Sequence, residues 1–181
     1  MTIISPLIPL IYDILISLFI GIASSTIFVL VILRILKPKI KISDKVCFDY
    51  DSNNKKFFFF KVVNESIFDA YSCEFVLHRR DPYIIDNSKI NHRLKKIELS
   101  KISIISLPRY KKEKGYGDHA FLIRTFEDLS NDIDDKNLDY VLSVRVKHGL
   151  SNLTKVTQKY FVSSKVFHNG EFKFGSNIDV C

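Results

Sequence analysis

One uninterrupted apolar stretch, residues 14–33, decides most of what this chain can fold into. It contains no charged residue and consists mainly of Ile, Leu, Val and Phe. A helix of about 20 residues is about 30 Å long, which matches the hydrocarbon core of a bilayer. The sequence therefore predicts a single transmembrane helix over residues 14–36, after a short extracytoplasmic N-terminus at residues 1–13. A cleaved signal peptide is the alternative interpretation, but the basic leader and the small-residue cleavage site that it requires are missing.

The positive charge of the chain lies entirely on one side of this stretch. All 27 Lys and Arg residues occur at or after Arg34, and Asp13 is the charged residue that precedes it. The positive-inside rule then places the N-terminus outside and the following domain in the cytoplasm, at the plasma (inner) membrane. We expect a basic juxtamembrane segment at residues 37–45, and contacts to anionic lipid headgroups from Arg34, Lys37, Lys39, Lys41 and Lys45. A topogenic flank without lipid specificity is the alternative.

Small residues recur along one side of the predicted helix. Ser17, Gly21 and Ser25 follow one another at intervals of four, so they fall on one helical face. This pattern lets two membrane helices approach closely, and it predicts a helix–helix interface in a homo-oligomer. Small residues are also common in membrane helices, so a chance spacing is the alternative interpretation.

From residue 46 onward the hydrophobic period changes from helical to two, as in β-strands. Residues 57–64 are apolar enough for a strand that is buried on both faces. The strand expected at residues 70–78 alternates, and one of its faces carries Tyr71, Cys73, Phe75 and Leu77. Further strands are expected at residues 97–107, 120–126, 138–146 and 156–162.

Two polar segments interrupt this pattern in different ways. Residues 79–92 are polar, contain Pro82 and predict a loop. The Asn169-Gly170 dipeptide predicts a tight hairpin turn inside residues 166–174. Because no soluble helix is indicated, the strands should pair mostly antiparallel, and a β-sandwich is the economical way to close them. We therefore expect an all-β antiparallel β-sandwich over residues 46–176, followed by a tail at residues 177–181.

Motifs that carry chemistry are missing from this sequence. It has no nucleophile elbow, P-loop or dinucleotide fingerprint, and its five His residues have no metal-ligand spacing. The acidic segment 127–137 lacks the Gly and Glu positions of an EF-hand, which favours a solvated turn. The three widely spaced cysteines predict reduced thiols. We therefore expect a protein without catalytic, cofactor or metal residues.

Basic clusters mark the domain at residues 78–80, 93–96 and 109–114. Such clusters can bind lipid headgroups, anionic nucleotides or nucleic acid. A basic domain held against an anionic leaflet accounts for the sign of the charge without nucleic acid. The expected order of partners is therefore lipid headgroups first, an anionic nucleotide second and nucleic acid third.

Three stretches, in order, resemble the cytoplasmic domain of inward-rectifier potassium channels. They are FFFFKVVNESIFDAYSCEFVLHRRD, LKKIELSKISIISLPR and LDYVLSVRVKHGLSNLTKVTQKYFVSSKVFHNGEFKF. The resemblance covers most of residues 46–175. It implies an immunoglobulin-like sandwich, a ring of subunits, and a response to anionic lipid through Arg34, Lys37, Lys39 and Lys41. The second span, pore helix and filter of that family are missing, so potassium conduction is not implied.

Three hypotheses for function follow. The first is a single-pass membrane protein whose cytoplasmic sandwich is a non-catalytic assembly, binding or sensing module with a protein or small-molecule partner. The second is a membrane-acting effector of the bacterial defence or toxin type, in which the sandwich senses a signal and clustered spans permeabilise the bilayer. The third is a ligand-binding enzyme whose site has no recognised motif.

Overall fold

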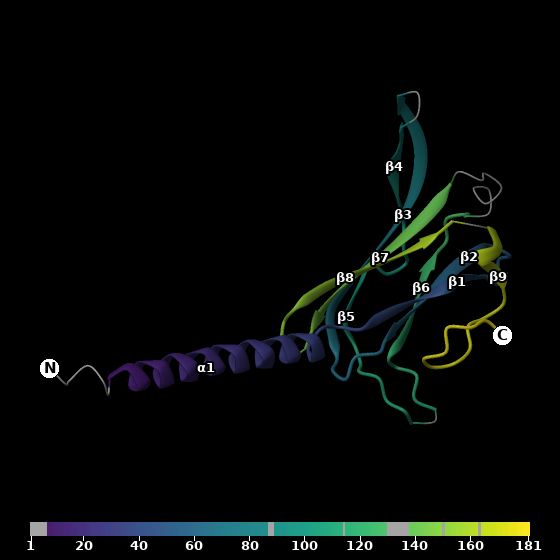
Figure 1. Ribbon diagram of the computed structural model, residues 1–181. Helices are drawn as coiled ribbons and strands as arrows, with labels where there is room; N and C mark the ends of the chain where they lie inside the picture. The colour runs from purple at the N-terminus through teal and green to yellow at the C-terminus, as the bar shows by residue number, and fades with distance from the viewer. Residues whose placement is uncertain (1–6, 87–88, 114, 130–137, 150, 163) are drawn as a thin grey trace. The chain divides into compact units, whose positions relative to one another are not determined.

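The computed structural model describes the chain except for residues 1–6, 87–88, 114, 130–137, 150 and 163 (Figure 1). The described chain divides into two compact units, Met1–Lys37 and Pro38–Cys181. The predicted acidic turn at residues 127–137 lies largely outside the described residues.

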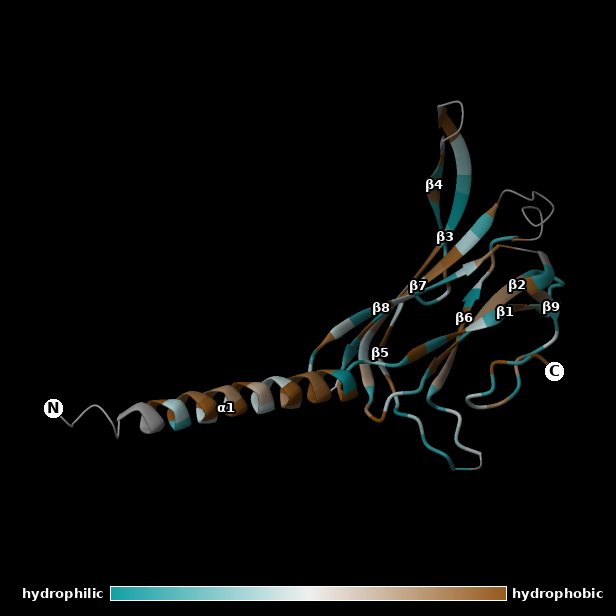
Figure 2. Ribbon diagram, viewed as in Figure 1, coloured by the Kyte–Doolittle hydropathy of each residue, from teal (hydrophilic) through white to brown (hydrophobic). Residues whose placement is uncertain are grey.

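The first unit is the helix α1, Leu7–Ile35. It confirms the predicted apolar helix near the N-terminus, although it begins at Leu7 rather than at residue 14. Pro9 is tolerated because it lies in the first turn, where its missing N–H has no helical partner. Between Ile11 and Ile35 the helix is long and apolar enough to cross a membrane (Figure 2).

The second unit is built mainly of β-strands, which form two sheets. The first sheet has the order β6-β2-β1-β9, with bounds β6 Ala120–Thr125, β2 Lys56–Asn64, β1 Ile40–Tyr50 and β9 Phe167–Asn169. The second has the order β4-β3-β7-β8, with β5 also pairing β3, and its bounds are β4 Lys89–Ile97, β3 Ala70–Asp86, β7 Asp139–His148, β8 Thr154–Phe161 and β5 Ser103–Leu107. A short 3-10 helix, Ser164–Val166, precedes β9. The pairings are antiparallel except β1 with β9, as expected in the main.

Side chains from both sheets meet in one hydrophobic core. Phe60 of β2 lies 5.3 Å from Phe161 of β8, and Phe75 of β3 stacks at 5.5 Å on Phe121 of β6, measured between ring centroids. Residues 58–64 of β2 are buried on both faces, which confirms the prediction for this strand. The face away from the core is covered by the C-terminal segment. There the Lys61 ammonium donates to the carbonyls of Lys173 and Asn177 at 2.6 and 2.7 Å.

The β domain extends beyond its predicted bounds, residues 46–176, at both ends. β1 begins at Ile40, so residues 40–45 of the expected juxtamembrane segment are part of the first sheet. The alternation of cations with apolar residues there is that of a strand, because Ile40 and Ile42 are buried in the core. The expected tail also belongs to the domain, since Val180 pairs with Phe172 and the Ile178 carbonyl accepts from the Ser43 hydroxyl at 3.0 Å.

The predicted loop at residues 79–92 is wrong. β3 continues to Asp86 and returns as β4, and the two strands form a hairpin that extends beyond the rest of the second sheet (Figure 1). The hairpin lies outside the core, so both of its faces can be polar. Pro82 is tolerated because β7 pairs β3 only as far as Arg80, which leaves one edge of β3 free at Pro82.

The predicted hairpin turn at Asn169-Gly170 is also wrong. β9 ends at Asn169 and pairs parallel to β1, while the Gly170 N–H donates to the Phe48 carbonyl at 3.3 Å. The core decides this arrangement, because Phe167 packs edge-on against Phe58 at 5.7 Å between centroids. The expected strand at residues 97–107 is divided between the end of β4 and β5.

Candidate functional site

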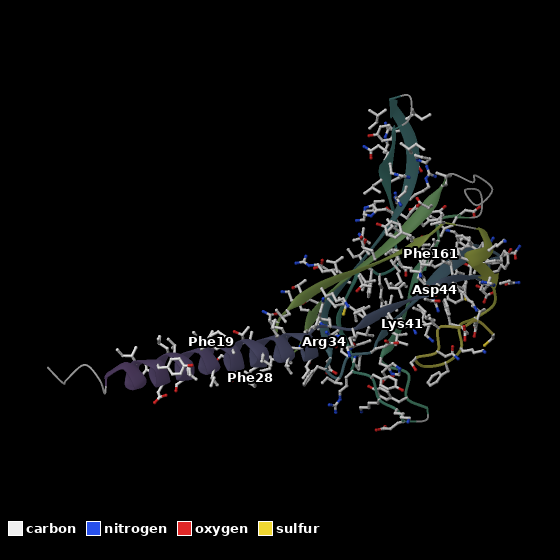
Figure 3. The ribbon with its side chains drawn as sticks, in the orientation of Figure 1. Phe19, Phe28, Arg34, Lys41, Asp44 and Phe161 are labelled. Atoms are coloured by element: carbon white, nitrogen blue, oxygen red, sulfur yellow. The ribbon has the colours of Figure 1, made fainter. Side chains whose placement is uncertain are left out.

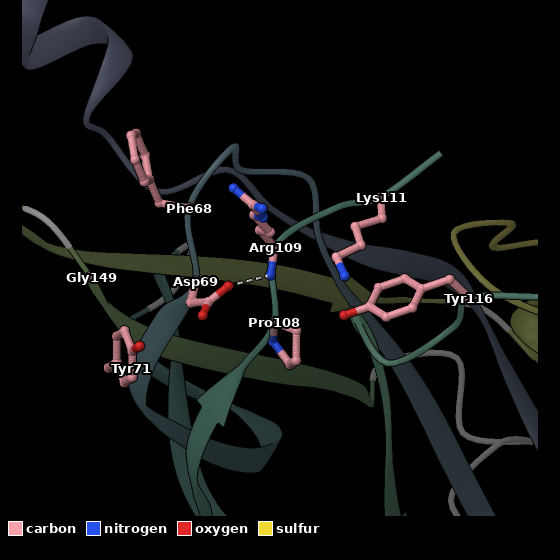
Figure 4. Close-up of a pocket in the computed structure, with 8 residues that line it drawn as sticks. All are labelled: Phe68, Asp69, Tyr71, Pro108, Arg109, Lys111, Tyr116 and Gly149. Carbon is pink, nitrogen blue, oxygen red and sulfur yellow. Dashed lines mark hydrogen bonds between the residues drawn. The ribbon is translucent and has the colours of Figure 1, made fainter. Parts of the chain in front are cut away.

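A cleft of about 470 Å³ opens at the end of the β domain where the chain enters it at Pro38. We call this the proximal end, and it is held together by Lys39, whose N–H donates to the Ser66 hydroxyl at 2.8 Å. The cleft is lined by Phe68, Asp69, Tyr71, Pro108, Arg109, Lys111, Tyr116 and Gly149 (Figure 4). These residues come from the β2–β3 turn, the start of β3, the loop after β5 and the end of β7.

Asn64, the last residue of β2, fixes the two loops that form the cleft. Its side chain is fully buried, and its amide nitrogen donates to the carbonyls of Phe68, Leu107 and Pro108 at 3.0–3.1 Å. Its amide oxygen accepts from the Ser66 N–H at 2.9 Å. One side chain therefore satisfies backbone groups of both the β2–β3 turn and the segment after β5.

Gly149 allows the floor of the cleft to close. Its N–H donates to the Asp69 carbonyl at 3.0 Å. A Cβ at position 149 would lie 2.9 Å from that carbonyl oxygen and 2.7 Å from the Tyr71 ring. Tyr71 itself was predicted to share the core face with Cys73, but it is 42% exposed. An irregularity at Ser72, which has φ of +47°, turns Tyr71 outward toward the cleft.

Two cations give the cleft its charge. Within the described part of the chain, neither the Arg109 guanidinium nor the Lys111 ammonium forms an ion pair. Lys111 lies 4.6 Å above the centroid of the Tyr116 ring. Asp69 is the acid of the cleft, and its carboxylate accepts the Arg109 N–H at 2.8 Å (Figure 4). Two cations against one carboxylate, beside aromatic side chains, leave the lining with a net positive charge, which suits an anionic group such as a phosphate.

The cations predicted to contact lipid are distributed over both units. Arg34 lies in the last turn of α1, and Lys37 ends the first unit. Lys39 is exposed at the proximal end. The other two have acid partners inside the β domain: Lys41 pairs with Glu65 at 3.6 Å, and Lys45 with Asp179 at 3.5 Å. The side chains of Lys41, Asp44 and Arg34 are labelled in Figure 3.

The small residues predicted to form a helix–helix interface lie within α1. Ser17, Gly21 and Ser25 are all exposed. A Cβ added at Gly21 would meet nothing within 4 Å, so the face is open to an approaching helix. Large apolar side chains such as Phe19 and Phe28 project from the same helix (Figure 3).

Two buried histidines pack against aromatic residues that line the cleft. His148 packs edge-on against Phe68 at 5.0 Å between centroids, and burial lowers the pKa of His148 from 6.5. His119 lies between the rings of Tyr110 and Tyr116 at 5.2 and 5.7 Å. Burial, and then the nearby Lys61 charge, lower the pKa of His119, so its imidazole is neutral at pH 7.

Titratable side chains elsewhere in the described chain do not assemble into a metal site. No group of three His, Cys, Asp or Glu residues is placed to hold a metal among these residues. Cys47 and Cys73 are buried and Cys181 is exposed, and all three are free thiols. Burial raises the pKa of Cys47 to about 12 and that of Cys73 to about 11.

The sequence indicated only part of this cleft. The basic cluster at residues 109–114 and the turn at Asn64 were visible in it. Phe68, Tyr71 and Gly149 were not assigned to a site, because only the folded chain brings these three segments together. The hydrophobic Ile67-Phe68 pair inside an otherwise polar turn is the local signal that could have indicated a surface.

Comparisons with known proteins do not identify a family. No protein-family model matches the chain, and no curated protein matches it. A solved structure, that of Northeast Structural Genomics Consortium target SoR45, is similar over 75% of this chain and 94% of that chain, with 9% sequence identity and a TM-score of 0.31.

Proposed function

We propose that this protein is a single-pass membrane protein whose β domain is a non-catalytic module that binds anionic, phosphate-bearing groups at the proximal cleft. The observation that carries the proposal is that Arg109 and Lys111, neither of which forms an ion pair within the described part of the chain, outnumber the one acid, Asp69, in a cleft lined by aromatic side chains. By contrast, Lys41, Arg80 and Arg145 on the strands are paired with acids.

Membrane anchorage by α1 is supported by the surface of the helix. Its described side chains are exposed and largely apolar on every side, a pattern that is costly in water and favourable in hydrocarbon. Arg34 at its C-terminal end, together with the absence of cations before it, favours a cytoplasmic β domain at the plasma (inner) membrane.

The β domain in this proposal is an immunoglobulin-like sandwich. Its support is the mostly antiparallel pairing of two sheets and the single core to which both contribute. The proposed oligomer forms partly through Ser17, Gly21 and Ser25. Replacing Gly21 with Leu should reduce crosslinking of the full-length protein in membranes several-fold, whereas Ile22→Leu on a neighbouring face should not. An unchanged yield for Gly21→Leu would contradict this interface.

Binding can be tested with inorganic pyrophosphate as the probe. The full chain in zwitterionic nanodiscs is titrated by calorimetry, and the Arg109→Gln/Lys111→Gln double variant should bind at least tenfold more weakly. The matched control is Lys95→Gln/Lys96→Gln, which removes the same charge from the β3–β4 hairpin. An equal loss in the control would show general attraction to a basic protein rather than a site.

A further inference from the structure

We infer that the proximal end of the β domain docks onto an anionic bilayer surface, with Ile67 and Tyr110 in contact with the lipid interface. This inference rests on the proposed function, because it names the source of the phosphate groups that the cleft would bind. It concerns a surface of the β domain that includes one predicted lipid contact, Lys39, and adds Ile67, Tyr110, Arg109 and Lys112 to it.

Two loops form this surface and are bonded to each other. The β2–β3 turn carries Ile67, which is 59% exposed, and the loop after β5 carries Tyr110, which is 42% exposed. The Tyr110 N–H donates to the Ser66 carbonyl at 3.2 Å, so the two side chains are presented from one rigid unit. An exposed Ile beside an exposed Tyr is the combination found where proteins enter the headgroup region of a membrane.

Exposed cations lie in or are bonded to the segments that carry these side chains. Lys39, Arg109 and Lys112 are all exposed at the same end, and none forms an ion pair within the described part of the chain. Exposed apolar side chains on segments that also carry such cations complement anionic headgroups above acyl chains. A protein partner for this surface would need a matching acidic rim around an apolar pocket.

The covalent connection keeps this surface near any membrane that contains α1. Only Leu36 and Lys37 separate Ile35 from Pro38, so the chain cannot carry Pro38 more than about 11 Å from Ile35. The Lys39 carbonyl also accepts the Glu65 N–H at 2.8 Å, which ties the start of the domain directly to the β2–β3 turn.

The chain contains no tryptophan, so a single introduced Trp reports on one position without background. We would place it at Ile67 and, as a matched control, at Ile84 on the β3–β4 hairpin, which is 76% exposed. Along β3 the two sites are separated by about 45 Å. The full chain is reconstituted in nanodiscs of phosphatidylcholine, with or without about one-third phosphatidylserine, and brominated acyl chains serve as quencher.

In anionic discs, Trp fluorescence of Ile67→Trp should shift to shorter wavelength and be quenched at least threefold more than that of Ile84→Trp. Replacing Lys39, Arg109 and Lys112 with Gln in the Ile67→Trp protein should bring the quenching down to the level seen in zwitterionic discs. Equal quenching of Ile67→Trp and Ile84→Trp would overturn the inference. So would a blue shift of Ile67→Trp that depends on protein concentration without quenching by lipid, because it would indicate a second copy as the occupant.

A third reporter separates this inference from the proposed function. Phe19→Trp in α1 should be quenched in both kinds of disc if the helix is in the bilayer. Quenching of Phe19→Trp without quenching of Ile67→Trp refutes the docking surface alone. Absence of quenching at Phe19→Trp refutes membrane anchorage, and the docking surface with it.

Discussion

Asn64 is the side chain on which the proximal end depends, and its replacement by Ala is the most direct test of the structure. The change removes the amide that donates to three backbone carbonyls and accepts one N–H. The two amide hydrogens are shared among the three carbonyls, so we count three bonds, two donated and one accepted. At about 1 kcal/mol each, the loss amounts to about 3 kcal/mol.

That loss is a large part of the stability of a domain of this size, which is typically about 5–15 kcal/mol. Because each kcal/mol corresponds to about 4 °C, the melting temperature should fall by about 12 °C. The measurement is circular dichroism of the full chain in detergent during heating, followed in the strand region of the spectrum. α1 should remain helical in the micelle, so the change reports on the β domain.

The control is Asn91→Ala on the β3–β4 hairpin. Asn91 is exposed; its amide nitrogen donates to the Tyr83 hydroxyl at 3.2 Å, and its amide oxygen accepts the His92 N–H at 2.8 Å. Because water can replace both bonds at the surface, the substitution should cost less than about 0.5 kcal/mol. If Asn64→Ala melts within 2–3 °C of Asn91→Ala, by the same conversion of about 4 °C per kcal/mol, the amide does not hold the two loops together and the reasoning fails.

Three further outcomes follow from buried groups. Because burial raises the pKa of Cys47 to about 12 and of Cys73 to about 11, maleimide at pH 7 should label the folded chain only at Cys181, and mass spectrometry detecting a second label would contradict this. Burial lowers the pKa of His119 from 6.5, so below pH 6.5 the unfolded state binds a proton that the folded state does not. The free energy of unfolding, measured in urea, should therefore decrease as the pH is lowered below 6.5. His119→Phe should make that fall smaller, and an equal slope would count against the assignment. Gly149→Ala brings a Cβ to 2.9 Å from a backbone oxygen and should cost about 1–3 kcal/mol, seen as a lower melting temperature; an unchanged value would be inconsistent with the close approach.

The parts of the fold that were predictable are those where burial leaves a local pattern. The four consecutive Phe residues from Phe57 indicate a strand covered on both faces, and the core and the C-terminal segment provide the two covers. β7 shows the regular alternation of a strand, with Leu142, Val144 and Val146 fully buried. In such strands burial follows a regular pattern along the chain, so the pattern of apolar residues in the sequence indicates it.

The parts that were missed depend on contacts between distant segments. β3 and β4 form a hairpin through backbone pairing, and along β3 Arg79 pairs with Asp81 at 2.6 Å. A strand outside the core needs no apolar face, so its sequence can be polar. No hairpin turn forms at Asn169-Gly170, because Phe167 packs in the core and β9 pairs with β1. The cleft required Asn64 to bring together loops that are about 40 residues apart, and no local period encodes such a contact.

The burial of Asn64 also limits how the orientation of the chain can be mapped. Asn64-Glu65-Ser66 and Asn152-Leu153-Thr154 are both acceptor sequences for N-linked sugars. A sugar on the first would have to be attached to the nitrogen that three carbonyls already occupy in the interior, so the folded chain cannot carry it there. Asn152 is exposed, and glycosylation mapping of this protein should therefore rely on that second acceptor alone.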